Sequence, residues 1–104
     1  RAVVATIPVG KRPRGIRVSP DGTRVYVALS GSAIAGPGVD ESTLPPPDRR
    51  ADGIGVIDTA TRTLVTTLKS GTDPEQFAVS QDGTRLFVAN EDAGLTSVVD
   101  IAKG

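Results

Sequence analysis

The sequence predicts an all-β fold of repeated four-stranded antiparallel units, and three observations support this. Short apolar runs rich in Val, Ile and Thr recur along the 104 residues, each bounded by Gly, Pro, Asp or Ser. No segment keeps the apolar stripe of an amphipathic helix. The chain also repeats itself, with Asp-Gly pairs, which favour tight hairpins, at matching places.

The repeat is clearest in one segment that occurs twice. Val18–Ala28 reads VSPDGTRVYVA and Val79–Ala89 reads VSQDGTRLFVA, with eight of eleven positions identical at an offset of 61 residues. IGVIDTA at Ile54–Ala60 aligns with TSVVDIA at Thr96–Ala102 at an offset of 42. The two offsets differ by an insertion of 19 residues, which lies within residues 30–52. Without the insertion the period is about 42 residues, a length typical of solenoids, propellers and arrays.

Eight strands are expected, in an order that the intervening residues justify. Asp21-Gly22 and Asp82-Gly83 each supply the positive φ that a hairpin needs. The insertion separates the third strand from the fourth, the turn at Thr59–Arg62 follows the fourth, and Gly71–Pro74 precedes the sixth. The expected strands are Val3–Ile7, Gly15–Ser19, Arg24–Leu29, Ile54–Asp58, Thr63–Lys69, Gln76–Ser80, Arg85–Asn90 and Ser97–Ile101.

Four strands in each period favour β-propeller blades, and the repeated segments point to one family. VSPDGTRVYVA, VSQDGTRLFVAN and GVIDTATRTLVTTLKSGTDP resemble the YVTN-type propeller repeats of bacteria and archaea, a lactonase-like propeller superfamily. The family's tetrapeptide falls at Tyr26-Val27-Ala28-Leu29 and Phe87-Val88-Ala89-Asn90. Ala replaces the Thr in both copies, and Leu29 replaces the Asn in the first. The resemblance covers nearly the whole chain apart from the insertion.

The resemblance implies how the strands are divided among blades. Val3–Ile7 is expected to be the outer strand of a preceding blade, Gly15–Lys69 a complete blade, and Gln76–Ile101 the first three strands of the next. We therefore expect a single segment, with repeat units at about residues 3–60 and 64–102, of a larger propeller. Two blades cannot close a ring, so either further blades of the same chain or self-association must complete it.

A two-blade segment is expected to leave apolar faces and unpaired edges exposed. The side chains expected on these faces are Ile16, Val18, Val25, Val27, Val56, Val65, Phe77, Val79, Leu86 and Val88.

The resemblance also implies that several loops share one end of the blades, around the central funnel where propellers bind ligands. These loops are the Gly-x-x-Pro turns Gly10–Pro13 and Gly71–Pro74, the insertion, and the link Glu91–Leu95. The candidate ligand-binding residues on them are Arg12, Arg14, Asp73, Glu75, Asn90, Glu91 and Asp92.

The chemistry of these residues leaves alternatives open. Lys11, Arg12 and Arg14 could clamp a carboxylate or phosphate, but solvent exposure accounts for them equally, because the second turn inverts the charge with Asp73 and Glu75. Asn90, Glu91 and Asp92 offer the oxygen ligands that calcium prefers. Their spacing lacks the alternating pattern of a calcium loop, so solvated turn residues are expected and no metal site is assigned.

Composition excludes several functions. Lys and Arg number 12, Asp and Glu also 12, so the net charge is zero and nucleic-acid binding is not expected. His, Cys, Met and Trp are absent, which removes catalysis that needs His or Cys and haem ligation by these residues. No apolar run is long enough to span a membrane. No catalytic residue or cofactor is expected, and Asp58 and Asp100 should cap turns.

The insertion, residues 30–52, is rich in Pro and Gly and should be an irregular surface loop. It is either a functional loop, acting as a lid or binding a partner, or a solvent-exposed loop that the fold merely tolerates. For the whole chain we expect a binding or assembly scaffold in an extracytoplasmic, periplasmic or secreted, protein that takes a protein or small-molecule ligand. The alternative is part of a propeller enzyme, a lactonase-like hydrolase or a periplasmic redox protein, with its substrate in the funnel.

Overall fold

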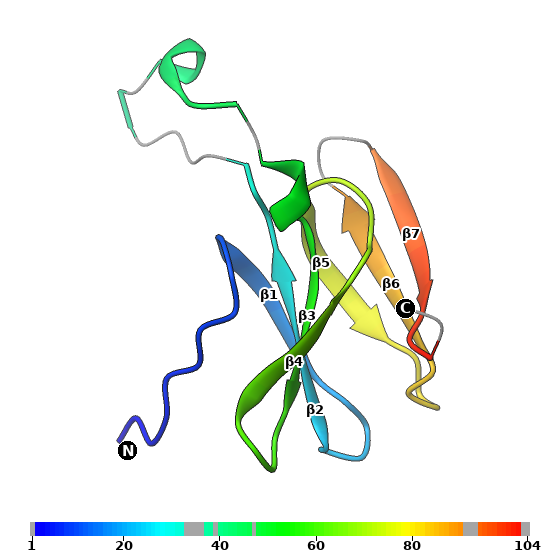
Figure 1. Cartoon of the computed structure of the whole chain (residues 1–104). Helices are drawn as coiled ribbons and strands as arrows, with labels where there is room; N and C mark the ends of the chain where they lie inside the picture. The colour runs from blue at the N-terminus through cyan, green and yellow to red at the C-terminus, as the bar shows by residue number, and fades with distance from the viewer. Residues whose placement is uncertain (1, 33–36, 39, 47, 91–93, 103–104) are drawn as a thin grey trace.

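The computed structural model describes residues 2–32, 37–38, 40–46, 48–90 and 94–102. Two antiparallel sheets make up the fold (Figure 1), one with strand order β1-β2-β3-β4, called sheet 1, and one with order β5-β6-β7, called sheet 2. Only two short 3-10 turns, η1 (Glu41–Thr43) and η2 (Arg49–Ala51), are helical among these residues. The all-β prediction is confirmed. The strands are β1 (Pro13–Val18), β2 (Arg24–Leu29), β3 (Gly53–Asp58), β4 (Thr63–Leu68), β5 (Pro74–Val79), β6 (Arg85–Asn90) and β7 (Leu95–Asp100).

The first expected strand, Val3–Ile7, is wrong, because residues 2–9 form no strand. A strand needs a neighbour whose backbone completes its hydrogen bonds, and no described strand pairs with this segment. The segment instead runs beside sheet 1 (Figure 1), where Ile7 and Val9 pack on the outer face of the sheet. Val3 and Val4 stay exposed.

The sequence repeat is also a repeat of register. In sheet 1, Pro13 pairs with Leu29 and Ile16 with Val27, with an irregularity between the two pairs. In sheet 2, Pro74 pairs with Asn90 and Phe77 with Val88, with the same irregularity. Because each residue of one set lies 61 positions from its counterpart, the two copies present equivalent residues to equivalent faces.

The hairpins at the end away from the insertion, called the hairpin end, are capped identically. Gly22 and Gly83 have φ values of 76° and 73°, as the Asp-Gly pairs predicted. Asp21 Oδ1 accepts hydrogen bonds from the backbone and hydroxyl of Thr23, and Asp82 Oδ1 does the same from Thr84.

Asp58 and Asp100 also cap turns as predicted, accepting from the backbone N–H groups of Ala60 and Ala102 at 2.9 and 3.1 Å.

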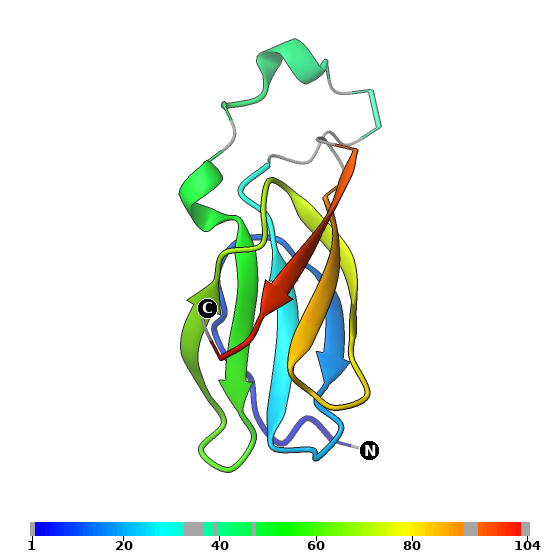
Figure 2. The ribbon, with the colours of Figure 1, turned by 90° about the vertical axis from the view of Figure 1, so that its right-hand side faces the viewer.

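The two sheets pack face to face, and Figure 2 shows the three strands of sheet 2 lying across those of sheet 1. A Cβ added to Gly15 in β1 would lie 2.7 Å from the carbonyl oxygen of Glu75 in β5, so only glycine allows this close approach. The buried side chains between the sheets, called the inter-sheet core, are Tyr26, Ala28, Ile54, Val56, Leu68, Phe77, Leu86, Val88 and Val99.

Each sheet has a second, outer face that the other sheet does not cover. On sheet 1, Val27, Leu29 and Ile57 form a separate buried cluster under the N-terminal segment, while Ile16 and Val18 stay exposed. On sheet 2, Phe87 and Val98 pair across β6 and β7 and are both exposed.

Candidate functional site

The loops predicted to share one end of the molecule do so among the described residues. Both Gly-x-x-Pro turns and the base of the insertion lie at one end of the sheets, and the hairpins lie at the other (Figure 1). This end, called the rim, carries the described candidate residues. Glu91 and Asp92 lie outside the described residues.

The two rim turns share an unusual backbone. Gly10 and Gly71 have positive φ, and so do the non-glycine residues two places later, Arg12 at 44° and Asp73 at 51°. The left-handed region is costly for most residues other than glycine, and Asp is among the few that tolerate it. The turns therefore hold Arg12 and Asp73 in equivalent, strained positions, where contacts with other residues must stabilise them.

Asp73 is the buried centre of an ion-pair cluster that joins the two sheets. Arg14 in β1 contacts Asp73 Oδ1 at 3.1 Å and Glu75 Oε1 at 3.2 Å through its two terminal nitrogens. Ser30 Oγ, just after β2, donates a hydrogen bond to the same Asp73 oxygen. Asp73 itself is buried. The structure thus brings together three of the predicted residues and one, Ser30, that was not predicted.

Asp52, the last residue of the insertion, completes this cluster. Its carboxylate accepts hydrogen bonds from the backbone N–H groups of Gly31 at 2.8 Å and Asp73 at 3.0 Å, and from Arg49 at 2.9 Å. Burial acts to raise the pKa of Asp52, but these three hydrogen bonds outweigh it and hold the pKa below its ordinary value. Asp52 therefore ties the insertion to the turn that carries Asp73. We call Arg14, Ser30, Asp52, Asp73 and Glu75 the rim cluster.

In the sequence, Asp52 follows Asp48-Arg49-Arg50, and this mixture of charges indicates surface pairs that neutralise one another. The ion pair of Arg49 with Asp52 agrees with that interpretation. The burial of Asp52 and its two backbone donors do not follow from it, because they depend on Gly31 and Asp73 approaching from elsewhere in the chain. The sequence feature that could have indicated the burial of Asp52 is its place at the end of the insertion, directly before a buried strand.

The two other cations of the first rim turn also have partners. Arg12 donates to the carbonyl of Ser32 at 3.3 Å, and Lys11 pairs with Asp48 at 3.1 Å. Arg14 is occupied by the rim cluster. A ligand anion at this point would have to displace internal carboxylates or a carbonyl, so the geometry favours a structural tie between sheets and insertion over an open anion clamp.

Asn90 is buried beside the rim cluster at the end of β6. Its Nδ2 donates to Ser97 Oγ at 2.7 Å, while its Oδ1 has no hydrogen-bond partner within the described residues. Gly71 lies directly above it, since a Cβ there would come within 2.9 Å of both amide heteroatoms. Asn90 therefore supports the second rim turn from below.

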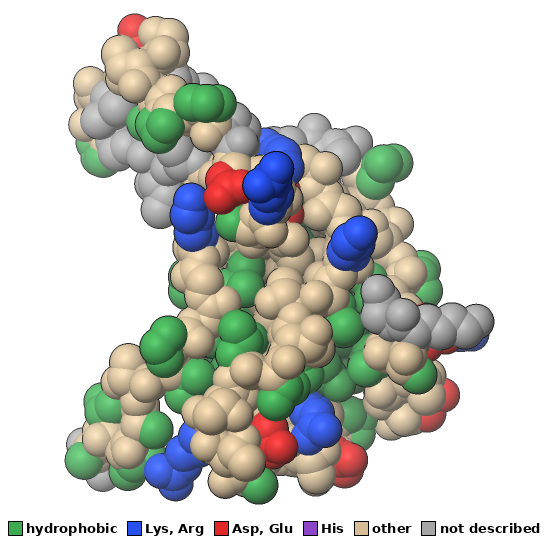
Figure 3. Space-filling model, viewed as in Figure 1, with side chains coloured by type: hydrophobic (Ala, Val, Ile, Leu, Met, Phe, Trp, Pro, Cys, Tyr) green, Lys and Arg blue, Asp and Glu red, His purple; other side chains and the backbone are tan. Residues whose placement is uncertain are grey.

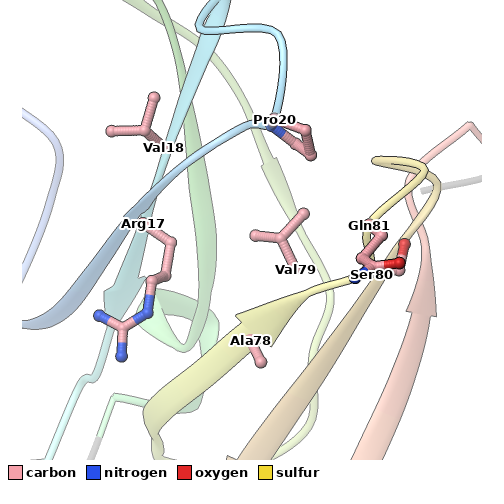
Figure 4. A pocket seen from close by; sticks show the side chains of 7 residues that line it. All are labelled: Arg17, Val18, Pro20, Ala78, Val79, Ser80 and Gln81. Atoms are coloured by element: carbon pink, nitrogen blue, oxygen red, sulfur yellow. The ribbon is translucent and has the colours of Figure 1, made fainter.

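A groove of about 440 Å³ runs between β1 and β5 (Figure 4). It is lined from the side of β1 by Arg17, Val18 and Pro20, and from the side of β5 by residues 78–81. The groove lies where the two sheets meet.

Two further properties concern the described residues as a whole. No set of three or more Asp and Glu side chains in the described ranges is arranged to hold a metal ion. No helix there has the length and apolar character needed to cross a membrane.

Comparison with known proteins defines the class of structure. No protein-family model and no curated protein matches the chain. Among solved structures, hydrazine synthase of Kuenenia stuttgartiensis is similar, with a TM-score of 0.65 and 22% sequence identity over 99% of this chain. The chain spans about a quarter of that protein's length, 24%. At this identity the likeness shows the fold alone: this is an all-β chain of two packed antiparallel sheets with a polar rim.

Proposed function

We propose that the chain forms consecutive blades of a YVTN-type β-propeller and serves as a binding and assembly scaffold in an extracytoplasmic protein. The 42-residue period, the shared register of the two copies and the resemblance of the repeated segments support the blade assignment. Neighbouring blades of a propeller pack face to face around a common axis, and the face-to-face packing of the two sheets supports the assignment.

The observation that carries the scaffold proposal is that the exposed faces are copies of buried ones. Tyr26 and Val56 lie in the inter-sheet core and are 3% and 5% exposed. Their counterparts in the second repeat, Phe87 and Val98, lie on the outer face of sheet 2 and are 43% and 61% exposed.

The opposite face of the molecule shows the reverse relation. Phe77 of sheet 2 is buried in the core, at 5% exposure, while its counterpart Ile16 on the outer face of sheet 1 is 59% exposed. The outer face of sheet 2 thus presents the counterparts of Tyr26 and Val56 openly. On the outer face of sheet 1, Ile16 and Val18 are exposed, whereas the N-terminal segment covers Val27 and Ile57. A further unit docking on sheet 2 would repeat the buried interface head to tail, as heterologous assemblies do.

The next unit is either another copy of this chain or further blades of the same polypeptide. Light scattering over a range of concentrations tests whether copies supply it, with a solution mass above that of one chain expected. Phe87→Asp and Val98→Asp should return the mass towards one chain, because each places a charge in the repeated interface. Leu95→Asp is the control, since Leu95 is as exposed as Val98 but lies on the other face of β7.

Two results would contradict the scaffold proposal. One is a chain that is monomeric at all concentrations and binds no dye specific for apolar surface. The other is an association that Leu95→Asp disrupts as strongly as Phe87→Asp does.

A further inference from the structure

A second cavity lies on the rim, away from the groove of Figure 4, where the turn after β4 meets η2. Its volume is about 280 Å³, close to the lower limit of small-molecule sites, roughly 300 Å³. Figure 3 shows basic side chains gathered around an acidic one at this end of the molecule, beneath the insertion. The residues that line the cavity are Arg49, Arg50, Asp52, Lys69, Ser70 and Gly71.

The charges in this cavity do not cancel, although those of the whole chain do. Asp52 is already occupied by Arg49 and by two backbone N–H groups. Lys11 and, more weakly, Arg50 lower the pKa of the Asp48 carboxyl, which lies outside the cavity lining. The side chains of Arg50 and Lys69 form no hydrogen bond or ion pair with any described residue. Two cations therefore remain for a ligand in a chain whose net charge is zero.

Ser70 adds a polar group without a partner. The residue is only 2% exposed, and its Oγ makes no hydrogen bond within the described part of the chain. Buried hydroxyl groups are nearly always hydrogen-bonded, so this hydroxyl is a donor for which the fold itself provides no acceptor.

The cavity belongs to one repeat only. The residues 61 positions before Lys69 and Ser70 are Pro8 and Val9, and Arg50 lies in the insertion, which the second repeat lacks. The polar residues that close the hairpins recur in both copies, as Asp21 and Asp82 do. The Arg50–Lys69–Ser70 set has no such structural counterpart.

We propose that this cavity binds an oxyanion, the phosphate group of a small phosphorylated ligand or inorganic phosphate. Arg50 would supply its planar fork of N–H donors and Lys69 its ammonium group. The hydroxyl of Ser70 is closed off from solvent in this structure and would turn into the cavity to donate to the anion. Arg49 holds Asp52 and so keeps that carboxylate from repelling the anion. The site does not depend on the propeller assignment.

Titration with inorganic phosphate, followed by amide NMR at constant ionic strength, tests the site directly. Saturable shifts are expected at the amides of Ser70, Gly71 and Arg50. Arg50→Gln and Lys69→Gln should each weaken binding about tenfold, the loss of one charge-assisted hydrogen bond. Arg24→Gln makes the same change in net charge at the hairpin end and should leave the affinity within about twofold. Glycerol phosphate, titrated in parallel, shows whether an esterified phosphate binds more tightly than the free ion.

Ser70→Ala separates binding from folding. Because the hydroxyl has no partner in the fold, its removal should leave the denaturant midpoint unchanged or raised while it weakens phosphate binding. The proposal is overturned if chloride at the same ionic strength shifts the same amides equally. It is also overturned if Arg24→Gln weakens binding as much as Lys69→Gln, or if phosphate produces no saturable shift at these residues.

Discussion

At the hairpin end the two repeats are built alike, whereas at the rim they differ. Ser19 and Ser80 form the same hydrogen bonds. Each backbone N–H donates to the carbonyl of an Arg at 2.9 Å, and each hydroxyl accepts from the backbone N–H of that Arg at 3.0 Å. At the rim the equivalent positions are Arg12, which makes one long hydrogen bond to a carbonyl, and Asp73, which is buried at the centre of an ion-pair cluster.

This difference teaches which residues belong to the fold and which to this particular chain. A task that each unit must perform, such as closing a tight hairpin, is performed by the same residue types in both copies. The rim turns share their backbone conformation but not their side-chain chemistry. We therefore expect the residues that give this chain its own function, or that join one unit to the next, to lie at the rim.

The largest change in the free energy of unfolding is expected at the equivalent rim positions Arg12 and Asp73. Asp73→Ala leaves Arg14 with only part of its counter-charge and Ser30 without its acceptor, so the free energy of unfolding should fall by about 3 kcal/mol. Arg12→Ala should cost about 1 kcal/mol or less, because it removes a single long, partly buried hydrogen bond. Both variants place Ala in the same left-handed conformation, and the better tolerance of Asp for that conformation adds slightly to the loss for Asp73→Ala. Urea unfolding measures the difference.

Equal losses for Asp73→Ala and Arg12→Ala would show that the backbone of the turn, and not the buried ion pair, determines stability at the rim. The difference in side chains between the two rim turns would then make no difference to the free energy of unfolding.

A second equivalent pair sharpens the comparison where the sheets meet. Gly15 lies against the backbone of β5, while its counterpart Gln76 is exposed. Gly15→Ala should lower the free energy of unfolding by about 2 kcal/mol, because the new Cβ forces the sheets apart. Gln76→Ala should change it by no more than about 0.5 kcal/mol. Thermal unfolding of both variants checks this, and a Gly15→Ala protein as stable as the parent would mean that the sheets are not packed this closely.

Most of the fold follows from the sequence because strands and hairpins are local. The repeated VSxDGTR segments predicted the hairpins, their positive-φ glycines and their Asp caps, and the Asp58 and Asp100 turns followed from their equivalent places. The prediction of a strand at Val3–Ile7 was wrong because the pattern of apolar residues shows that a segment can form a strand. It does not show that a partner strand lies beside it.

The site was less predictable because burial is not a local property. Arg14, Asp73 and Glu75 were chosen as rim residues, and the structure brings them together, but their pairing with one another depends on the packing of β1 against β5. Asp52 and Ser30 were missed for the same reason. The unpartnered cations Arg50 and Lys69 are 19 residues apart in the sequence, and only the turn after β4 brings them to one cavity.

The smallest expected effect is the pH dependence of stability that Asp21 and Asp82 cause, and it tests whether the two hairpins are equivalent. Hydrogen bonds from the backbone and hydroxyl of Thr23, and from Ser19, lower the pKa of Asp21 from 3.8 to about 2. Bonds from the hydroxyls of Ser80 and Thr84, with the backbone of Thr84, lower that of Asp82 to about 2 as well. Because the folded pKa is depressed, the stabilising contribution is complete above pH 4 and is lost as the pH falls from about 4 to about 2.

Carbon-detected NMR titration should therefore give both carboxyls the same low pKa, and stability should decline over that pH range. Asp21→Asn and Asp82→Asn remove the titrating charge while keeping the acceptor oxygen, so each should flatten the decline by a similar amount. Two clearly different pKa values would mean that the hairpins are alike in backbone only. The contrast between a uniform hairpin end and a divergent rim would then disappear, because each end would vary from one repeat to the next.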